Sequence, residues 1–269
     1  WDEPIPDNVF AKFKQWILKL SSVEQFRLHR CFSPYATNLA AKIEGHVFVD
    51  ASEDMFAAVM YLVVRYADNI HVCFVAGKTK CAPLKLMSIP RLELQAAVLG
   101  TRLKNTIFDS LSIQPARTIF WSDSKTVISW IHSDQRQFKP FVAHRIAEIL
   151  ESTQSSDWQW VPTKLNAADA ATRAKYPIDY NPNNSIWVKG PSFLCQPETS
   201  WPTSGKFEHD WNADSEMKRQ CHAVKERESV IDYTRFSNYF ILVRTIAWIR
   251  RPLERIRHSS GQQTSSTLS

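Results

Sequence analysis

Apolar residues recur along this chain at two different spacings, and each spacing predicts a type of element. In residues 1–32 and 92–111 the apolar positions follow steps of three and four residues, which is typical of amphipathic helices. Shorter helical periods follow in residues 127–131 and 141–150. Apolar runs bounded by turn residues predict strands at 46–49, 57–66, 70–76, 118–121 and 158–161.

The order of these elements predicts an α/β fold. Three strands come first, followed by a helix, a strand, two helices, a strand and a final helix that begins at Ala167. Consecutive strands joined by short turns favour an antiparallel meander, whereas strands separated by helices favour a mixed sheet. The sequence therefore predicts a mixed five-stranded sheet flanked by helices, with helical N-terminal and C-terminal extensions.

Composition suggests how the chain is divided. The sheet region should span residues 44–180, after a helical region at 1–40. Residues 181–216 are punctuated by Pro, Asn and Trp, which predicts a linker, and residues 217–258 predict a basic helical connector. The Ser-, Thr- and Gln-rich residues 259–269 predict a disordered tail. Because the sequence begins at Trp1 without a leader, we expect a piece of a longer polypeptide.

The net charge of +6 is concentrated in one segment. Residues 217–258 contain ten basic and four acidic residues, so the rest of the chain is neutral. Two interpretations stay open: this segment binds phosphates, or it is a solvated connector. Its most apolar stretch has only 14 residues and contains Arg244, whereas a membrane-spanning helix needs roughly 20 apolar residues. We therefore expect no transmembrane segment and no membrane partner.

Glycine and cysteine usage argues against several classes of site. Six glycines, none in a GxGxxG run, exclude a dinucleotide-binding turn. The five cysteines are never spaced as CxxC, which argues against a disulfide framework and a zinc module and favours a reducing compartment. Gly77-Lys78-Thr79 lacks the first glycine of a phosphate-binding loop, and neither Ser122 nor Ser124 lies in a GxSxG motif. A nucleoside triphosphatase and a serine hydrolase are therefore disfavoured.

Four acidic residues lie at the ends of predicted elements: Asp50 and Asp123 after strands, and Glu93 and Asp169 near the starts of helices. Each alone has a structural explanation, since Asp at strand ends makes turns and acids in a first helical turn complement the helix dipole. Together they favour a site, because parallel neighbouring strands would bring Asp50 and Asp123 to one sheet edge. Crowded carboxylates repel one another unless cations bridge them, and oxygen ligands suit Mg²⁺. Two such ions about 4 Å apart can support phosphodiester cleavage.

The acids also lie within longer motifs. The most specific is the run Ser-Ile-Pro-Arg-Leu-Glu-Leu at 88–94. Further motifs are Val-Phe-Val-Asp-Ala-Ser at 47–52, Ala-Pro-Leu-Lys at 82–85, Trp-Ser-Asp-Ser at 121–124, Phe-Val-Ala-His-Arg at 141–145 and Asn-Ala-Ala-Asp at 166–169. Tryptophan-containing segments follow at 186–191 and 201–202. In order and kind, these segments resemble the ribonuclease H region of BEL/Pao-type LTR retrotransposon polyproteins, the Pao retrotransposon family.

This resemblance implies an RNase H-like fold and an endonuclease that cleaves the RNA strand of RNA:DNA hybrids during reverse transcription. It implies that the four acids bind Mg²⁺, with Mn²⁺ as the alternative. Residues 1–40 would then be the tail of a polymerase region, and residues 217–258 would lead toward an integrase region. Both regions of the polyprotein would be partners, and an active element would work in the cytoplasm within a virus-like particle.

One departure from the superfamily pattern concerns turnover. Related enzymes usually have a histidine in the loop before the last acid, thought to assist product release, whereas residues 161–166 contain none. A second hypothesis therefore stays open, a catalytically impaired nucleic-acid-binding module from a decayed element. An integrase core is disfavoured because it typically has three acids and follows a zinc module.

Several side chains near the acids are candidates for contacts with nucleic acid. They are Ser52, Ser124, Lys125, Lys139, Arg145 and Lys164, and His144 is a further candidate. Lys164 is better explained as an exposed loop lysine. Contacts with phosphates and 2′-hydroxyls would recognise a hybrid by its shape without reading bases. The tryptophans at strand and helix positions are expected in the core rather than stacked on bases.

Overall fold

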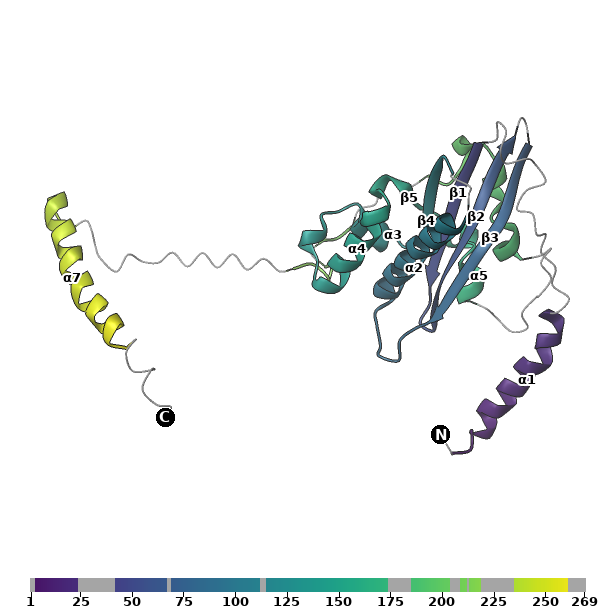
Figure 1. The fold of residues 1–269 in the computed structure, drawn as a ribbon, viewed down its shortest axis with the longest axis horizontal. Coiled ribbons are helices and arrows are strands. Elements are labelled where there is room, and N and C mark those ends of the chain that lie inside the picture. The colour runs from purple at the N-terminus through teal and green to yellow at the C-terminus, as the bar shows by residue number, and fades with distance from the viewer. Residues whose placement is uncertain are drawn as a thin grey trace. The chain divides into compact units, whose positions relative to one another are not determined.

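The computed structural model describes residues 3–23, 42–66, 69–111, 115–173, 185–203, 209–211, 213–218 and 235–260. The chain divides into two compact units, Trp1–Lys218 and Arg219–Ser269. The first unit contains the sheet and the helices around it, and the second contains α7 (Tyr239–Ser260) (Figure 1).

A mixed five-stranded sheet with the order β3-β2-β1-β4-β5 forms the centre of the first unit (Figure 1). The first three strands form an antiparallel meander, whereas β1, β4 and β5 run parallel to one another. The predicted α/β class and mixed sheet are confirmed. The first four strands extend beyond their predicted apolar runs because the ladder continues through polar residues, whereas the last strand ends one residue before its predicted end. The strands are β1 (Lys42–Ala51), β2 (Met55–Tyr66), β3 (Asn69–Cys81), β4 (Arg117–Ser122) and β5 (Trp158–Trp160).

Helix α2 (Ile89–Ser110) lies across β1 and β2 on one face of the sheet (Figure 1). It begins after Ser88 with a proline in its first turn, as its sequence predicts. A Cβ at Gly100 would lie 2.5 Å from Val49 Cγ1, so the helix backbone approaches β1 closely only because this residue has no side chain. Helices α3 (Lys125–Ile131) and α4 (Pro140–Ser152) extend the same core.

The second face of the sheet is covered by α5 (Asp169–Thr172), α6 (Ile186–Lys189) and the irregular chain around α6. We call residues 185–203 the covering segment. Its residues Phe193, Leu194 and Trp201 are buried against Phe48 and Trp121 of the sheet. The predicted linker over 181–216 is therefore wrong for the covering segment. Its proline-rich composition resembles a linker, but an apolar sheet face requires a cover, and these side chains supply it.

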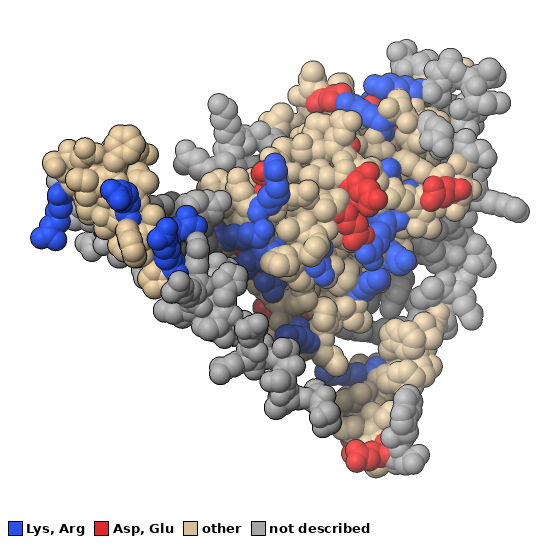
Figure 2. Space-filling model, turned by 60° about the vertical axis from the view of Figure 1, so that its left-hand side comes forward, with Lys and Arg blue, Asp and Glu red and all other residues tan. Residues whose placement is uncertain are grey.

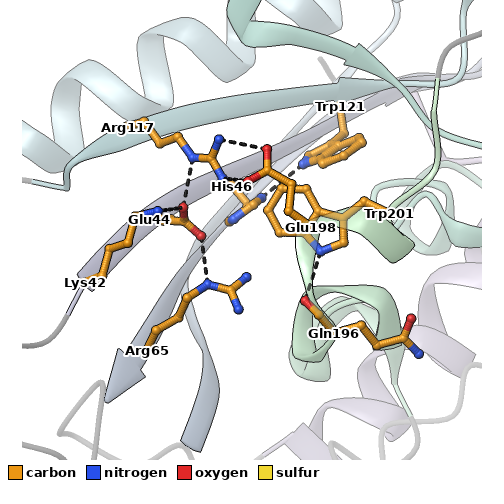
Figure 3. Close-up of polar contacts among 9 residues, drawn as sticks. All are labelled: Lys42, Glu44, His46, Arg65, Arg117, Trp121, Gln196, Glu198 and Trp201. Carbon is orange, nitrogen blue, oxygen red and sulfur yellow. Dashed lines mark hydrogen bonds and ion pairs between the residues drawn. The ribbon is translucent and has the colours of Figure 1, made fainter. Parts of the chain in front are cut away.

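A buried ion-pair cluster joins the covering segment to the start of β1 (Figure 3). The Glu44 side chain has no exposed surface and lies within 3.1 Å of Lys42, 3.0 Å of Arg65 and 2.8 Å of Arg117. Arg117 also donates two hydrogen bonds to Glu198 of the covering segment, at 2.9 and 2.7 Å. Burial raises the pKa of Glu44, but hydrogen bonds from Arg65 and Lys42 and the charge of Arg117 outweigh burial and hold this pKa at about 2. The carboxylate therefore stays ionised and paired.

His46 lies two residues farther along the same face of β1 and is completely buried (Figure 3). Its Nδ1 accepts a hydrogen bond from Trp121 Nε1 at 3.1 Å, and its ring meets that of Trp201 edge to face, with centroids 5.2 Å apart. Its Nε2 has no hydrogen-bond partner among the described residues. Burial lowers the pKa of His46 to about 3, because water cannot solvate the charged ring there. The imidazole is therefore neutral at physiological pH.

A second segment, most of it from the predicted linker, also packs on the domain, near the start of α2. It comprises residues 209–211 and 213–218, so the linker prediction is wrong here too. Trp130 of α3 donates its indole hydrogen to Asp214 at 2.6 Å. Arg91 of α2 donates two hydrogen bonds to Glu216, at 2.8 and 3.0 Å. These hydrogen bonds attach the segment to the domain. Its few apolar residues did not predict that it would pack there. The part of the predicted linker at 204–208 and position 212 lies outside the described residues.

The helical extensions predicted at both ends are present as α1 (Asp7–Val23) and α7. Both helices carry exposed large apolar side chains. None of the described helices is long and apolar enough to cross a membrane. The tail predicted to be disordered overlaps α7 at its first two residues, and residues 261–269 lie outside the described part of the chain.

Candidate active site

The four acids predicted from the sequence lie on different elements of the first unit. Asp50 lies at the end of β1, and Asp123 directly follows β4. Because Val49 pairs with Ser122 in the parallel β1–β4 ladder, these two acids leave the sheet at the same edge, as predicted. Glu93 lies one turn into α2, slightly beyond the first turn expected for it. Asp169 is the first residue of α5.

Hydrogen bonds link the surroundings of the four acids. Ser124, next to Asp123, donates to Glu93, and the segment that carries Asp169 donates to Asp123 and to Asp50. The negative charge of Asp123 raises the pKa of Asp50, of Glu93 and of Asp169, in each case after the larger effect of burial. Asp169 also raises the pKa of Asp50. The structure therefore brings all four predicted residues into one cluster.

Asp50 is the most perturbed member of the cluster. Its side chain is buried, with 4% of the residue exposed, whereas the other three acids are half-buried. Burial raises its pKa to about 7, and the charges of Asp123 and Asp169 add to this effect, while a hydrogen bond from Thr172 opposes it. A carboxylate buried among other acids is unstable as an anion unless positive charge or donors compensate it.

Each acid has a polar neighbour in the protein. Ser124 Oγ donates to Glu93 Oε2 at 2.5 Å, and Thr172 Oγ1 donates to Asp50 Oδ2. Asn166 Nδ2 donates to Asp123 Oδ1 at 3.2 Å, and the Arg173 guanidinium lies 2.6 Å from Asp169 Oδ1. Three of these neighbours come from the short stretch 166–173, which carries Asp169 itself.

The chemistry of this cluster fits a hard divalent cation. All the candidate ligands are carboxylate oxygens, and the buried Oδ1 of Asp169 accepts no hydrogen bond of normal geometry despite its ion pair with Arg173. As the side chains stand, no three His, Cys, Asp or Glu groups among the described residues surround a single point. Each carboxylate instead interacts with its own protein neighbour.

The predicted nucleic-acid contacts divide into two groups. Lys125, Lys139, His144 and Lys164 are exposed. Lys125 lies 5.5 Å from the centre of the Trp160 ring, and Lys139 Nζ donates to the carbonyl of Ser215 at 2.6 Å.

The other candidates are engaged within the protein. The Ser52 hydroxyl caps the β1–β2 turn through the backbone of Met55. Ser124 is the N-cap of α3 and donates to Glu93, so it belongs to the acidic cluster. Arg145 is half-buried and donates a hydrogen bond to the backbone carbonyl of Phe141. Its guanidinium carbon lies 3.5 Å from the centre of the Phe141 ring.

Two residues of the site were not identified from the sequence. Thr172 and Arg173 follow Asp169 by three and four positions, which places all three side chains on one side of a helical turn. That spacing was the available signal. The sequence alone places Asn166 only within the Asn-Ala-Ala-Asp motif at 166–169. Its bridge from Asp123 to the backbone of Val49, at 3.2 and 3.0 Å, depends on tertiary packing.

The first unit is thus an α/β domain with a mixed five-stranded sheet, flanking helices and acidic residues near one edge of the sheet. Residues 1–124 match the family model described as the Pao retrotransposon-like RNaseH-like domain, so this part of the chain is similar to that family. The resemblance predicted from the motifs is thereby confirmed. The match includes Asp50, Glu93 and Asp123, whereas Asp169 lies beyond it.

Solved structures similar to this chain include several RNase H domains. The N-terminal RNase H domain of a Mycobacterium tuberculosis protein is 17% identical, with 49% of this chain and 95% of that chain covered and a TM-score of 0.33. RNase H1 from the halophilic archaeon Halobacterium salinarum is 15% identical, with coverages of 48% and 92% and a TM-score of 0.31. LC11-RNase H1 in complex with an RNA/DNA hybrid is 14% identical, with coverages of 48% and 91% and a TM-score of 0.33. No curated protein matches the chain.

Proposed function

We propose that this protein is a ribonuclease H that cleaves the RNA strand of RNA:DNA hybrids with the help of divalent cations. The observation that carries the proposal is that four carboxylates lie near one edge of the sheet and are linked through hydrogen bonds from Ser124, Asn166 and Thr172. The family match supports the same class of enzyme.

Asp50, Glu93, Asp123 and Asp169 would hold Mg²⁺ or Mn²⁺ through their oxygens. When bound, such ions activate water and stabilise the leaving oxygen in phosphodiester hydrolysis. The chain's own contribution is to concentrate negatively charged carboxylates in a partly buried position. Water solvates these carboxylates poorly there, which favours their binding of a cation. Ser124, Asn166, Thr172 and Arg173 limit the repulsion among the acids and fix their directions.

A hybrid substrate would be recognised through its backbone. Lys125 and Lys164 are exposed on the segments that carry Asp123 and precede Asp169, so phosphates next to the scissile bond would lie within reach of both. Acidic and basic side chains are interspersed on the face shown in Figure 2. Recognition of the hybrid would then depend on local contacts and on the shape of the duplex.

The biological setting proposed for this activity is reverse transcription by a retroelement. The chain would work beside reverse transcriptase and integrase regions of one polyprotein, in a cytoplasmic virus-like particle. The exposed apolar side chains of α1 are compatible with a neighbouring region on that side of the chain.

The test is cleavage of a labelled RNA:DNA hybrid by the full chain, with Mg²⁺ or with a chelator, and with RNA and DNA duplexes as controls. We expect cleavage of the hybrid's RNA strand only when Mg²⁺ is present. Asp123→Asn should reduce cleavage to background because it removes the central charge of the cluster. Asp134→Asn, at an exposed acid paired with Arg136, is the matched control and should cleave normally.

Binding without cleavage would favour the second candidate, a nucleic-acid-binding module without activity. The observation behind that candidate is the loop before Asp169, where Thr163–Leu165 form a single 3-10 turn without a histidine. Absence of both binding and cleavage would contradict both functions.

A further inference from the structure

The stretch from Asn166 to Arg173 connects three of the four acids, although only Asp169 belongs to it. Asn166 is buried and uses both of its amide hydrogens, one on the carbonyl of Val49 at 3.0 Å and one on Asp123 at 3.2 Å. Its Oδ1 accepts from the backbone N–H of Ala168 at 3.2 Å. The start of α5 is thereby fixed to the ends of β1 and β4.

Thr172 lies one turn farther along α5 and is also buried, with 7% exposed. Its hydroxyl has one hydrogen and two acceptors in reach, the carboxylate of Asp50 and the carbonyl of Asp169 at 3.3 Å. The carboxylate is the nearer and the charged acceptor, so the hydrogen goes to Asp50. Among the described residues this is the hydrogen bond that the Asp50 side chain accepts, and it occupies Oδ2.

Building on the proposed function, we propose that Thr172 is a positioning residue that orients the Asp50 carboxylate for cation binding. The hydroxyl holds Oδ2 and leaves Oδ1 as the oxygen that can bind a cation. Because Asn166 fixes the start of α5, the hydroxyl keeps its place even where the acids repel one another. Residues that orient a metal ligand typically contribute 10- to 100-fold to metal affinity or activity.

Direct titration of the metal-free full chain with MgCl₂, followed by calorimetry, tests this role without requiring catalysis. Thr172→Val keeps the shape of the side chain and removes the donor, so we expect Mg²⁺ affinity to fall by roughly 10- to 100-fold. Thr172→Ser keeps the hydroxyl and should stay within about threefold of the unaltered protein, on the same scale. Rescue by serine separates the donor from the methyl group.

Thr101→Val is the matched control, because Thr101 is a buried helical threonine whose hydroxyl donates to the carbonyl of Ala97 at 3.1 Å. Its Mg²⁺ affinity should equal that of the unaltered protein. Cleavage assays add a second readout: Thr172→Val should lower kcat at subsaturating Mg²⁺ and leave KM for the hybrid unchanged.

Three outcomes overturn the proposal: equal Mg²⁺ affinities for Thr172→Val and the unaltered chain, failure of Thr172→Ser to restore binding, or no Mg²⁺ binding at all. Failure of the proposed function looks different. In that case the unaltered chain binds Mg²⁺ and responds to Thr172→Val as expected, but it cleaves no hybrid.

Discussion

The buried His46 predicts how the stability of the sheet domain depends on pH. In the folded protein its pKa is held at about 3, because burial excludes water, whereas the usual value is 6.5. Glu44 and Glu198 raise this pKa and Arg117 and Arg65 lower it, so the charged neighbours partly cancel and burial decides the direction. As pH falls below 6.5, His46 becomes protonated in the unfolded chain but stays neutral in the folded protein. The free energy of unfolding therefore decreases.

The loss of stability at pH 5 is set mainly by the pKa of His46 in the unfolded chain. Each pH unit below 6.5 costs about 1.4 kcal/mol until the folded pKa is reached, so the loss between pH 7.5 and pH 5 is about 2 kcal/mol. Glu44 adds little in this window, because its folded pKa of about 2 places its own loss of stability at lower pH.

Urea unfolding of the full chain and of His46→Gln at both pH values measures this loss. Glutamine retains an acceptor for the Trp121 indole and cannot titrate, so the variant should lack the loss of about 2 kcal/mol, whatever its stability at pH 7.5. Other titrating groups contribute equally to both proteins and cancel in the comparison. His144→Gln, at an exposed position of α4, is the control and should retain the full pH dependence. An unchanged pH dependence in His46→Gln would refute the burial of His46 beneath the covering segment.

Three further predictions concern the covering segment, the acids and the basic end. Trp201→Ala should lower the free energy of unfolding by about 3–5 kcal/mol in urea titrations, because this residue is 6% exposed and packs on His46 and Trp121; a reduction below about 1 kcal/mol would show that the covering segment is not part of the core. Asp50→Asn should raise the melting temperature of the metal-free protein at pH 8, because ionised Asp50 destabilises the folded state. This gain should shrink as pH falls from about 7 toward 4, since Asp50 then becomes neutral in the folded protein. A lower melting temperature of the variant at pH 8 would contradict repulsion among the acids. Truncation after Lys218 should flatten the salt dependence of hybrid binding and leave kcat unchanged, with a change in logarithmic slope of roughly 0.9 for each phosphate that the removed residues neutralise. An unaltered slope would instead assign residues 219–258 to a solvated connector.

The sequence alone was sufficient for the five strands, for the helices that follow them as far as α5, and for the association of each of the four acids with one of these elements. Strand and helix periods are local properties of the chain, and Asp50 and Asp123 follow strands whose apolar runs are unambiguous. Parallel pairing of β1 and β4 then places both acids at one edge, which the order of the elements already favoured.

The tertiary structure decided what lies around these acids and what covers the second sheet face. The contacts of Asn166 and Thr172 with Asp123 and Asp50 join residues far apart in the chain, so no local pattern predicts them. The covering segment resembles a linker by composition and is buried because the second face of the sheet is apolar. Burial of the Glu44 carboxylate likewise depends on cations from three strands and on Glu198, and only the folded chain brings these groups together. Local periodicity determines elements, whereas compensation of charge and coverage of apolar surface are properties of the assembled fold.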